Sequence, residues 1–126
     1  MGISTKRRRR ITVDDREYLW WVQEDPENYY APYQPGVRVA TEDRRLLVRY
    51  HLGQSGEHRH VTVLGPEFRG LPGLGGPWRR YRCPAFGSAD SFRPADAAAL
   101  IRWCAEAGAP PLEVDFRGNL IARVKD

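Results

Sequence analysis

The chain of 126 residues has only two cysteines and two lysines, and it contains no long apolar run. Two cysteines are too few for the disulfide framework of a small secreted protein, so we expect Cys83 and Cys104 to be free thiols in a reducing cytoplasm. No apolar stretch approaches the roughly 20 residues that cross a bilayer, and no apolar segment follows the basic residues near the N-terminus. These absences predict a cytoplasmic protein with neither a secretory signal nor a membrane partner.

The signatures of several common enzymes are also missing. The glycine-rich stretch GLPGLGGPW, residues 70–78, lacks the Lys-Ser/Thr pair of a phosphate-binding P-loop, and the sequence contains no Gly-x-Ser-x-Gly elbow. Cys83 has arginines close to it in the sequence but no histidine that could act as its base. We therefore expect no cofactor, and we favour a binding role over an enzymatic one.

The formal net charge of +4 is concentrated at the N-terminus. Residues 1–10 contain five basic side chains and no acidic one, which leaves 15 basic and 16 acidic side chains for residues 11–126. A nucleic-acid-binding domain usually spreads its basic residues over one face of the fold. This balance predicts a basic, flexible tail at residues 1–10, followed by a nearly neutral single domain at residues 11–126 without a broad basic surface.

Alternating apolar residues and turn signals predict a sheet built mostly from hairpins. The first hairpin is expected around the turn Asp14-Asp15-Arg16, and the second around the polar turn at residues 41–45. The expected strands cover residues 11–13, 17–22, 37–40, 46–52, 60–64, 78–84, 112–116 and 120–124.

One amphipathic helix is predicted over residues 93–108. Pro94 suits the first helical position, and Gly108 suits the residue that follows the last turn. Apolar residues recur at helical spacing and form one stripe that faces the core, namely Ala97, Leu100, Ile101 and Cys104. The predicted fold class is therefore α+β, an antiparallel sheet of hairpins with one helix packed on one face.

Four segments carry a resemblance to known proteins: KRRRRITVDDREYLWWV at residues 6–22, VTVLGPEFRGL at residues 61–71, WRRYRCP at residues 78–84 and RPADAAALIRWC at residues 93–104. Together they resemble a group of short bacterial proteins of unknown function, which begin with a basic run, an ITVDG-like turn and a Trp-rich strand. The proteins of this group end with a helix whose first residue is proline. Asp15 stands where these proteins have a turn glycine, and Arg93 stands where they have a threonine that caps the helix. The resemblance implies a bacterial, cytoplasmic, single-domain protein and supplies no catalytic residue.

The basic residues form the first candidate site. The N-terminal run could follow a phosphate backbone, with Trp20 and Trp21 stacking on bases and the arginines before Cys83 as a second contact. The alternative is a solvated lead-in to a strand, in which Arg8 and Arg10 alternate with Arg9 and the charges protect the sheet edge. Weak, nonspecific binding to nucleic acid at low salt fits either alternative. The candidate residues are Lys6, Arg7, Arg8, Arg9, Arg10, Arg79, Arg80 and Arg82.

Three histidines form the second candidate site. His58 and His60 are two residues apart and point to the same side of a strand, while His51 lies on the preceding strand. Three imidazoles with Glu57 as a fourth ligand would suit zinc or nickel. The alternative is a set of polar residues at an exposed hairpin end, since no known metal spacing matches.

Two loops form the third candidate site. Residues 24–36 hold three prolines and the tyrosines Tyr29, Tyr30 and Tyr33, and residues 65–77 are rich in glycine and proline. Aromatic side chains on loops often anchor interfaces, although they can equally fold back over a sheet edge. We therefore predict a small module that binds another protein. Nucleic-acid binding is the alternative, and a metal-binding or enzymatic role comes third.

Overall fold

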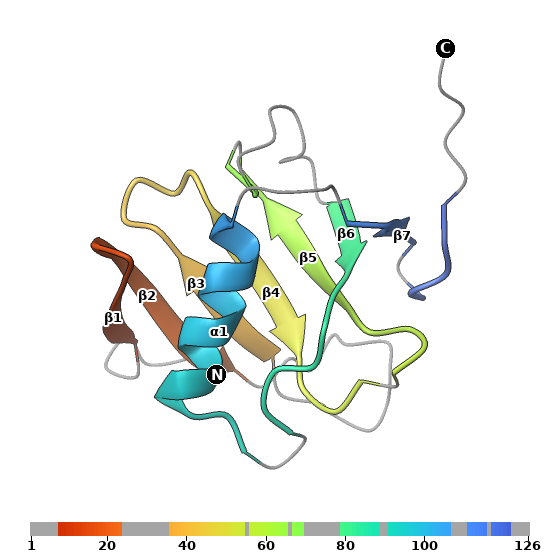
Figure 1. Cartoon of the computed structure of the whole chain (residues 1–126), viewed down its shortest axis with the longest axis horizontal. Coiled ribbons are helices and arrows are strands. Elements are labelled where there is room, and N and C mark those ends of the chain that lie inside the picture. The colour runs from red at the N-terminus through yellow and green to blue at the C-terminus, as the bar shows by residue number, and fades with distance from the viewer. Residues whose placement is uncertain are drawn as a thin grey trace.

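The computed structural model describes residues 8–23, 36–54, 56–65, 67–69, 79–88, 91–106, 111–115 and 117–121. These residues form one antiparallel sheet of seven strands and one helix (Figure 1). The strands follow one another across the sheet in chain order. They are β1 (Arg9–Val13), β2 (Arg16–Gln23), β3 (Gly36–Ala40), β4 (Leu47–His51), β5 (His60–Leu64), β6 (Arg79–Arg82) and β7 (Glu113–Val114), and the helix is α1 (Pro94–Ala105).

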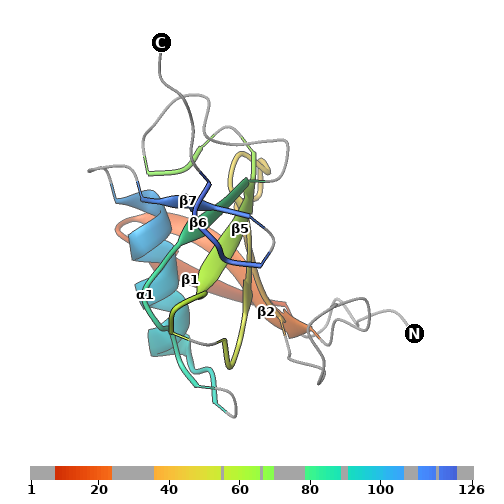
Figure 2. The same ribbon diagram turned by 90° about the vertical axis from the view of Figure 1, so that its right-hand side faces the viewer.

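The architecture agrees with the predicted antiparallel sheet and single helix in broad outline. Figures 1 and 2 show α1 lying across one face of the sheet. The C-terminal part differs from the prediction, because β7 is short and Leu120 returns only as a single bridge to Val114. The expected strand at residues 120–124 is reduced to this bridge in the part of the chain that the structure describes, and residues 122–126 lie outside it.

Two aspartates in the left-handed region close the hairpin of β1 and β2. Asp14 and Asp15 have φ angles of 50° and 66°, and Val13 pairs with Arg16 on either side of them. Positive φ at both central residues is the geometry of a type I′ turn, whose twist matches that of the flanking strands. Aspartate tolerates this conformation better than most residues do. The predicted turn is therefore confirmed, with two residues in its loop.

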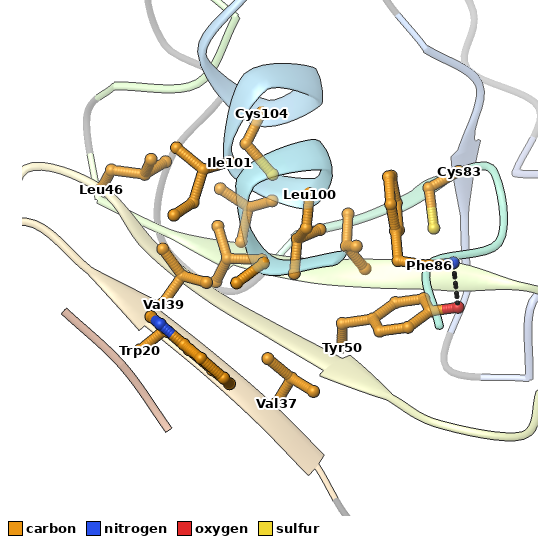
Figure 3. Close-up of a cluster of buried hydrophobic side chains, with 14 of the residues drawn as sticks. Trp20, Val37, Val39, Leu46, Tyr50, Cys83, Phe86, Leu100, Ile101 and Cys104 are labelled. Atoms are coloured by element: carbon orange, nitrogen blue, oxygen red, sulfur yellow. Dashed lines mark hydrogen bonds between the residues drawn. The ribbon is translucent and has the colours of Figure 1, made fainter. Parts of the chain in front are cut away.

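The core lies between α1 and one face of the sheet (Figure 3). Residues directly opposite one another in adjacent strands point to the same face. Two such runs cross the sheet and are at most 3% exposed, namely Trp20, Val39, Val48 and Val63, and Val37, Tyr50, Val61 and Tyr81. The predicted helix stripe packs against them, because its four residues are the buried ones of α1. Burial of these side chains supplies the main stabilisation of the fold.

Residues 67–69 join the helix to the sheet. Phe68 is 1% exposed, and its ring stacks on Tyr81 with 5.0 Å between centroids and meets the edge of Trp103 at 5.8 Å. The Arg69 backbone N–H donates to the carbonyl oxygen of Cys104 at 2.7 Å, and its guanidinium donates to that of Trp103 at 2.7 Å. The last carbonyl groups of a helix have no partner within the helix. Arg69 therefore completes the C-terminal end of α1.

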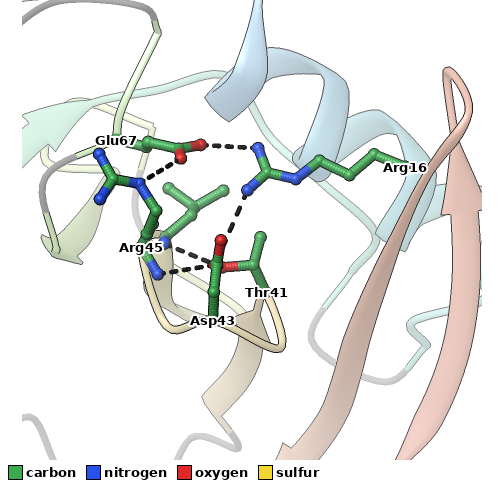
Figure 4. A network of polar contacts seen from close by, with 6 residues as sticks. Arg16, Thr41, Asp43, Arg45 and Glu67 are labelled. Atoms are coloured by element: carbon green, nitrogen blue, oxygen red, sulfur yellow. Dashed lines mark hydrogen bonds and ion pairs between the residues drawn. The ribbon is translucent and has the colours of Figure 1, made fainter.

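A polar network outside the core ties three turns together (Figure 4). Glu67 accepts hydrogen bonds from Arg16 Nη1 at 2.6 Å and from Arg45 Nε at 2.8 Å. Asp43 accepts one from the Thr41 hydroxyl at 2.7 Å and one from the Arg45 backbone N–H at 3.1 Å. The hydrogen bond from Arg16 is the main reason that the pKa of Glu67 lies below its ordinary value. The carboxylate form of Glu67 is therefore stabilised in the folded protein.

We expect Glu67→Gln to lower the free energy of unfolding by about 1 kcal/mol at pH 7, at the upper end for surface ion pairs because two arginines share one carboxylate. Folding lowers the pKa of Glu67 below its value of 4.5 in the unfolded chain, so the ionised carboxylate stabilises the folded protein above that pH. This stabilisation is lost as the pH falls through the lower pKa of Glu67 in the folded protein. Urea unfolding of both proteins should show their difference narrowing below pH 4.5. A difference that stays constant down to pH 2.5 would show that the network does not depend on this charge.

Candidate nucleic-acid interface

The face of the sheet opposite α1, which we call the open face, carries the candidate site. Among the described elements, no helix or strand lies over it (Figure 2). Successive residues of a strand point to opposite faces, so the neighbours of each core residue point to the open face. Three half-buried leucines, Leu19, Leu47 and Leu64, lie at one end of this face. The other strand positions on this face include several arginines, which can bind an anion, together with two histidines and one tryptophan.

One row of residues runs in register across the open face. Trp21 is opposite Arg38, and Arg38 is opposite Arg49. Arg49 is opposite Thr62, and Thr62 is opposite Arg80. Neighbouring strands are 4.7–4.9 Å apart, so these five positions span about 19 Å. We call Trp21, Arg38, Arg49, Thr62 and Arg80 the cross-strand row.

Trp21 forms the end of the cross-strand row on β2. The guanidinium carbon of Arg8 lies 4.6 Å from the centroid of the Trp21 ring, within the range of a cation–π contact. The indole Nε1–H donates to the side-chain oxygen of Gln23 at 3.3 Å. These two contacts fix the orientation of the half-buried ring. The stacked pair adds a fourth arginine to the line formed by Arg38, Arg49 and Arg80.

Acidic side chains are scarce on the open face. Within the described strands Glu17 is the one acidic residue that points to it, and Glu17 accepts a hydrogen bond from Arg10 Nη1 at 2.6 Å. Acidic residues gather instead in turns, as at residues 14–15 and 42–43. The near-neutral charge of residues 11–126 therefore conceals an uneven distribution. Register thus gathers three arginines of the domain on one face of the sheet, which the charge balance of the sequence did not indicate.

The predicted basic tail is partly a strand. β1 begins at Arg9, so the expected boundary at residue 10 falls inside the sheet. Arg8 and Arg10 lie on the open face, whereas the guanidinium of Arg9 lies 5.4 Å from the Trp20 ring on the core face. The alternation expected for an early strand start is thus confirmed. Lys6 and Arg7 lie outside the described residues.

The three arginines of β6 do not form a single patch. Arg80 belongs to the cross-strand row, and Arg82 follows it on the same side of the strand. Arg79 is opposite Val63 and therefore points to the core face. Of the predicted second contact, Arg80 and Arg82 remain on the open face and Arg79 does not.

The register of β4 and β5, continued by one pair beyond Tyr50 and Val61, brings His51 opposite His60 at the hairpin end. The Gln54 side-chain amide donates to the backbone carbonyl oxygens of both, at 2.8 and 2.9 Å. His60 Nδ1 lies 2.8 Å from the carbonyl oxygen of His58, and burial lowers the pKa of His60, so this ring is neutral at pH 7. His58 lies 4.0 Å from Glu57. The described residues contain no group of three His, Cys, Asp or Glu side chains that could hold a metal ion.

Both cysteines are free and buried. Burial raises the pKa of the Cys83 thiol to about 12, and it raises the pKa of Cys104 as well. A nucleophilic cysteine needs a depressed pKa, so both thiols stay protonated at neutral pH. They act as small apolar side chains in the core.

The candidate tyrosines Tyr29, Tyr30 and Tyr33 lie outside the described residues, as does most of the loop at residues 65–77. Protein binding through these loops therefore stays a prediction.

Among the described helices, none has the length and apolar character needed to cross a bilayer.

Comparison of the chain with protein-family models, with curated proteins and with solved structures finds no match. The resemblance to short bacterial proteins therefore stays a prediction. The function has to be inferred from the geometry of the molecule itself.

Proposed function

We propose that this protein binds single-stranded nucleic acid on the open face of its sheet. The cross-strand row carries the proposal, because register brings a tryptophan and three arginines from four strands into one line. Guanidinium groups stay charged at physiological pH and pair with phosphate oxygens in a bidentate geometry. Each phosphate that is neutralised releases condensed counterions, which favours binding.

The Arg8–Trp21 pair gives the row a surface on which a base can stack. Indole rings and guanidinium planes both stack on unpaired bases, with little preference among bases. Arg8 lies on the Trp21 ring at 4.6 Å, so a base placed on Arg8 extends an existing stack. The row therefore combines phosphate contacts with one stacking position, which suits a strand whose bases are exposed.

A duplex fits this surface poorly. The major groove of B-DNA is about 12 Å wide and admits a helix or a two-stranded ribbon. The cross-strand row crosses five strands and is about 19 Å long, which is too wide to enter that groove. A flexible single strand can instead lie along the row, with its backbone on the arginines and a base on the Arg8–Trp21 pair.

Fluorescence anisotropy with a labelled 20-nucleotide strand and the corresponding duplex tests this function. At 50 mM salt we expect a Kd on the order of 10 µM for the single strand, typical of sequence-independent binding, and at least about tenfold weaker binding of the duplex. Equal affinity for both would show that the surface responds only to charge density. Absence of binding to either at 100 µM protein would remove the proposal.

Trp21→Ala should weaken binding of the single strand by about 5- to 150-fold, because it removes the ring that supports the Arg8 guanidinium beneath the base, and a stack that includes an aromatic side chain contributes roughly 1–3 kcal/mol per base. The salt dependence of Kd should stay unchanged, since the substitution removes no charge. Trp21→Phe, which keeps an aromatic face, is the matched control and should bind within about threefold of the wild-type protein. If Trp21→Ala binds as tightly as Trp21→Phe, no base stacks at this position.

A further inference from the structure

His60 lies on the open face beside the cross-strand row. It comes two residues before Thr62 on β5, so the two side chains point to the same side of the sheet and start about 6.8 Å apart along the strand. The residue opposite His60 is Arg82, whose Nη2 already donates to the Gly118 carbonyl oxygen at 3.3 Å. In a single strand whose phosphates lie on the row, bases that project to this side can reach His60.

One glutamine fixes the backbone at His60. The Gln54 side-chain N–H groups donate to the carbonyl oxygens of His51 and His60 at 2.8 and 2.9 Å. The side-chain oxygen of Gln54 accepts a hydrogen bond from the His60 backbone N–H at 3.1 Å. Three hydrogen bonds from one amide thus tie the end of β4 to the start of β5, and they hold the base of the His60 side chain in place.

The half-buried ring of His60 presents a hydrogen-bond acceptor. Its Nδ1 lies 2.8 Å from the carbonyl oxygen of His58, and a carbonyl oxygen can only accept, so Nδ1 carries the proton. Burial is the main reason that the pKa of His60 lies below its ordinary value, and the positive charge of Arg80 contributes to the same effect. In the neutral ring Nε2 is therefore an acceptor, and it has no hydrogen-bond partner among the described residues.

The side chains around His60 on the open face are mostly donors. Guanidinium groups and the indole N–H of Trp21 donate hydrogen bonds and cannot accept them. Of the side-chain acceptors, Glu17 already accepts from Arg10 at 2.6 Å, and Gln23 accepts from Trp21 at 3.3 Å. A surface of this kind offers many partners to the oxygen and ring-nitrogen acceptors of a base. An amino group finds few partners there, and Nε2 of His60 is one of them.

We propose that His60 recognises a base of the bound strand, with its Nε2 accepting a hydrogen bond from the exocyclic amino group. Adenine, cytosine and guanine carry such a group, whereas thymine and uracil do not. The inference rests on the proposed function, because it requires a single strand on the cross-strand row. A base without the amino group still stacks, and its phosphate still binds, but Nε2 is left without a partner and affinity falls.

Two strands that differ only in this amino group test the proposal. Anisotropy at 50 mM salt compares a labelled 20-nucleotide strand of deoxyadenosine with a strand of equal length in which purine replaces adenine. One hydrogen bond corresponds to roughly 3- to 10-fold in affinity, so the adenine strand should bind more tightly by that factor. Equal Kd values would overturn this inference alone. Absence of binding to either strand would overturn the proposed function as well.

Variants of two histidines assign the preference to one ring. His60→Phe keeps an aromatic ring but has no acceptor, so its two Kd values should be equal, and it should bind the purine strand within about threefold of the wild-type protein. His58→Phe is the matched control, because the His58 side chain is 48% exposed and only its backbone carbonyl contacts His60. It should keep the full preference for adenine. A preference that survives in His60→Phe, or that is lost equally in His58→Phe, would overturn the proposal.

Discussion

Neutralising the three arginines of the cross-strand row should abolish most binding to single-stranded nucleic acid. In the variant Arg38→Gln/Arg49→Gln/Arg80→Gln we expect Kd to rise on the order of 1,000-fold. Hydrogen bonds to charged groups contribute roughly 1.5 kcal/mol each at the lower end of their range, and 1.4 kcal/mol corresponds to tenfold. The three side chains lie in one line, so a single strand can contact all of them together. Anisotropy at 50 mM salt should therefore detect no binding of this variant up to 100 µM protein.

A matched control carries the same change of net charge elsewhere. Arg44, Arg93 and Arg102 are exposed and lie outside the row, and Arg102 forms only a surface ion pair with Asp14 at 3.9 Å. The variant Arg44→Gln/Arg93→Gln/Arg102→Gln should bind within about threefold of the wild-type protein. Urea unfolding of both triple variants separates lost binding from lost folding. Equal losses in two folded triple variants would show that the row has no special role.

Phe68→Ala should lower the free energy of unfolding by about 3–5 kcal/mol, as expected for removing a buried aromatic ring. Phe68 is 1% exposed and lies between Tyr81 of the sheet and Trp103 of α1. Removing the ring leaves a cavity at the junction of sheet and helix, and it loosens the adjacent Arg69, which caps α1. The melting temperature should fall by roughly 10–20 °C in a protein of this size.

Two comparisons make the Phe68 result specific. Phe68→Leu keeps most of the apolar volume and should cost less than half as much as Phe68→Ala. Leu120→Ala, at a position that is 57% exposed, should change stability by less than about 0.5 kcal/mol. A loss below 1 kcal/mol in Phe68→Ala would mean that residues 67–69 do not pack on the core in solution.

The elements with strong local patterns could be predicted from the sequence. Helical spacing identified the buried stripe of α1, and Pro94 marked its start, as the structure has them. The two aspartates between apolar runs identified the first turn. In each case the signal depends on residues close together in the chain, which is where propensity and periodicity are informative.

The cross-strand row was missed because net charge sums over the chain and ignores direction. Arg38, Arg49 and Arg80 belong to three strands, and only the register of the sheet aligns them. The sequence nevertheless contained a signal for the side of the sheet to which these arginines point. Arg38 lies between two valines and Arg49 between Val48 and Tyr50, so each must point away from the face on which its neighbours are buried. Strand alternation applied to the arginines would have placed both on one face.

The central claim is that the open face, and not the N-terminal residues ahead of it, contacts phosphate. The most direct test compares the slope of log Kd against log salt for Arg38→Gln/Arg49→Gln and for Lys6→Gln/Arg7→Gln, two variants with the same loss of charge. Each phosphate contact with a single strand contributes about 0.7 to this slope. We predict that the slope falls by about 1.4 in the row variant and stays at the wild-type value in the N-terminal variant. The reverse result, an unchanged slope in the row variant and a reduced one in the N-terminal variant, would contradict the claim.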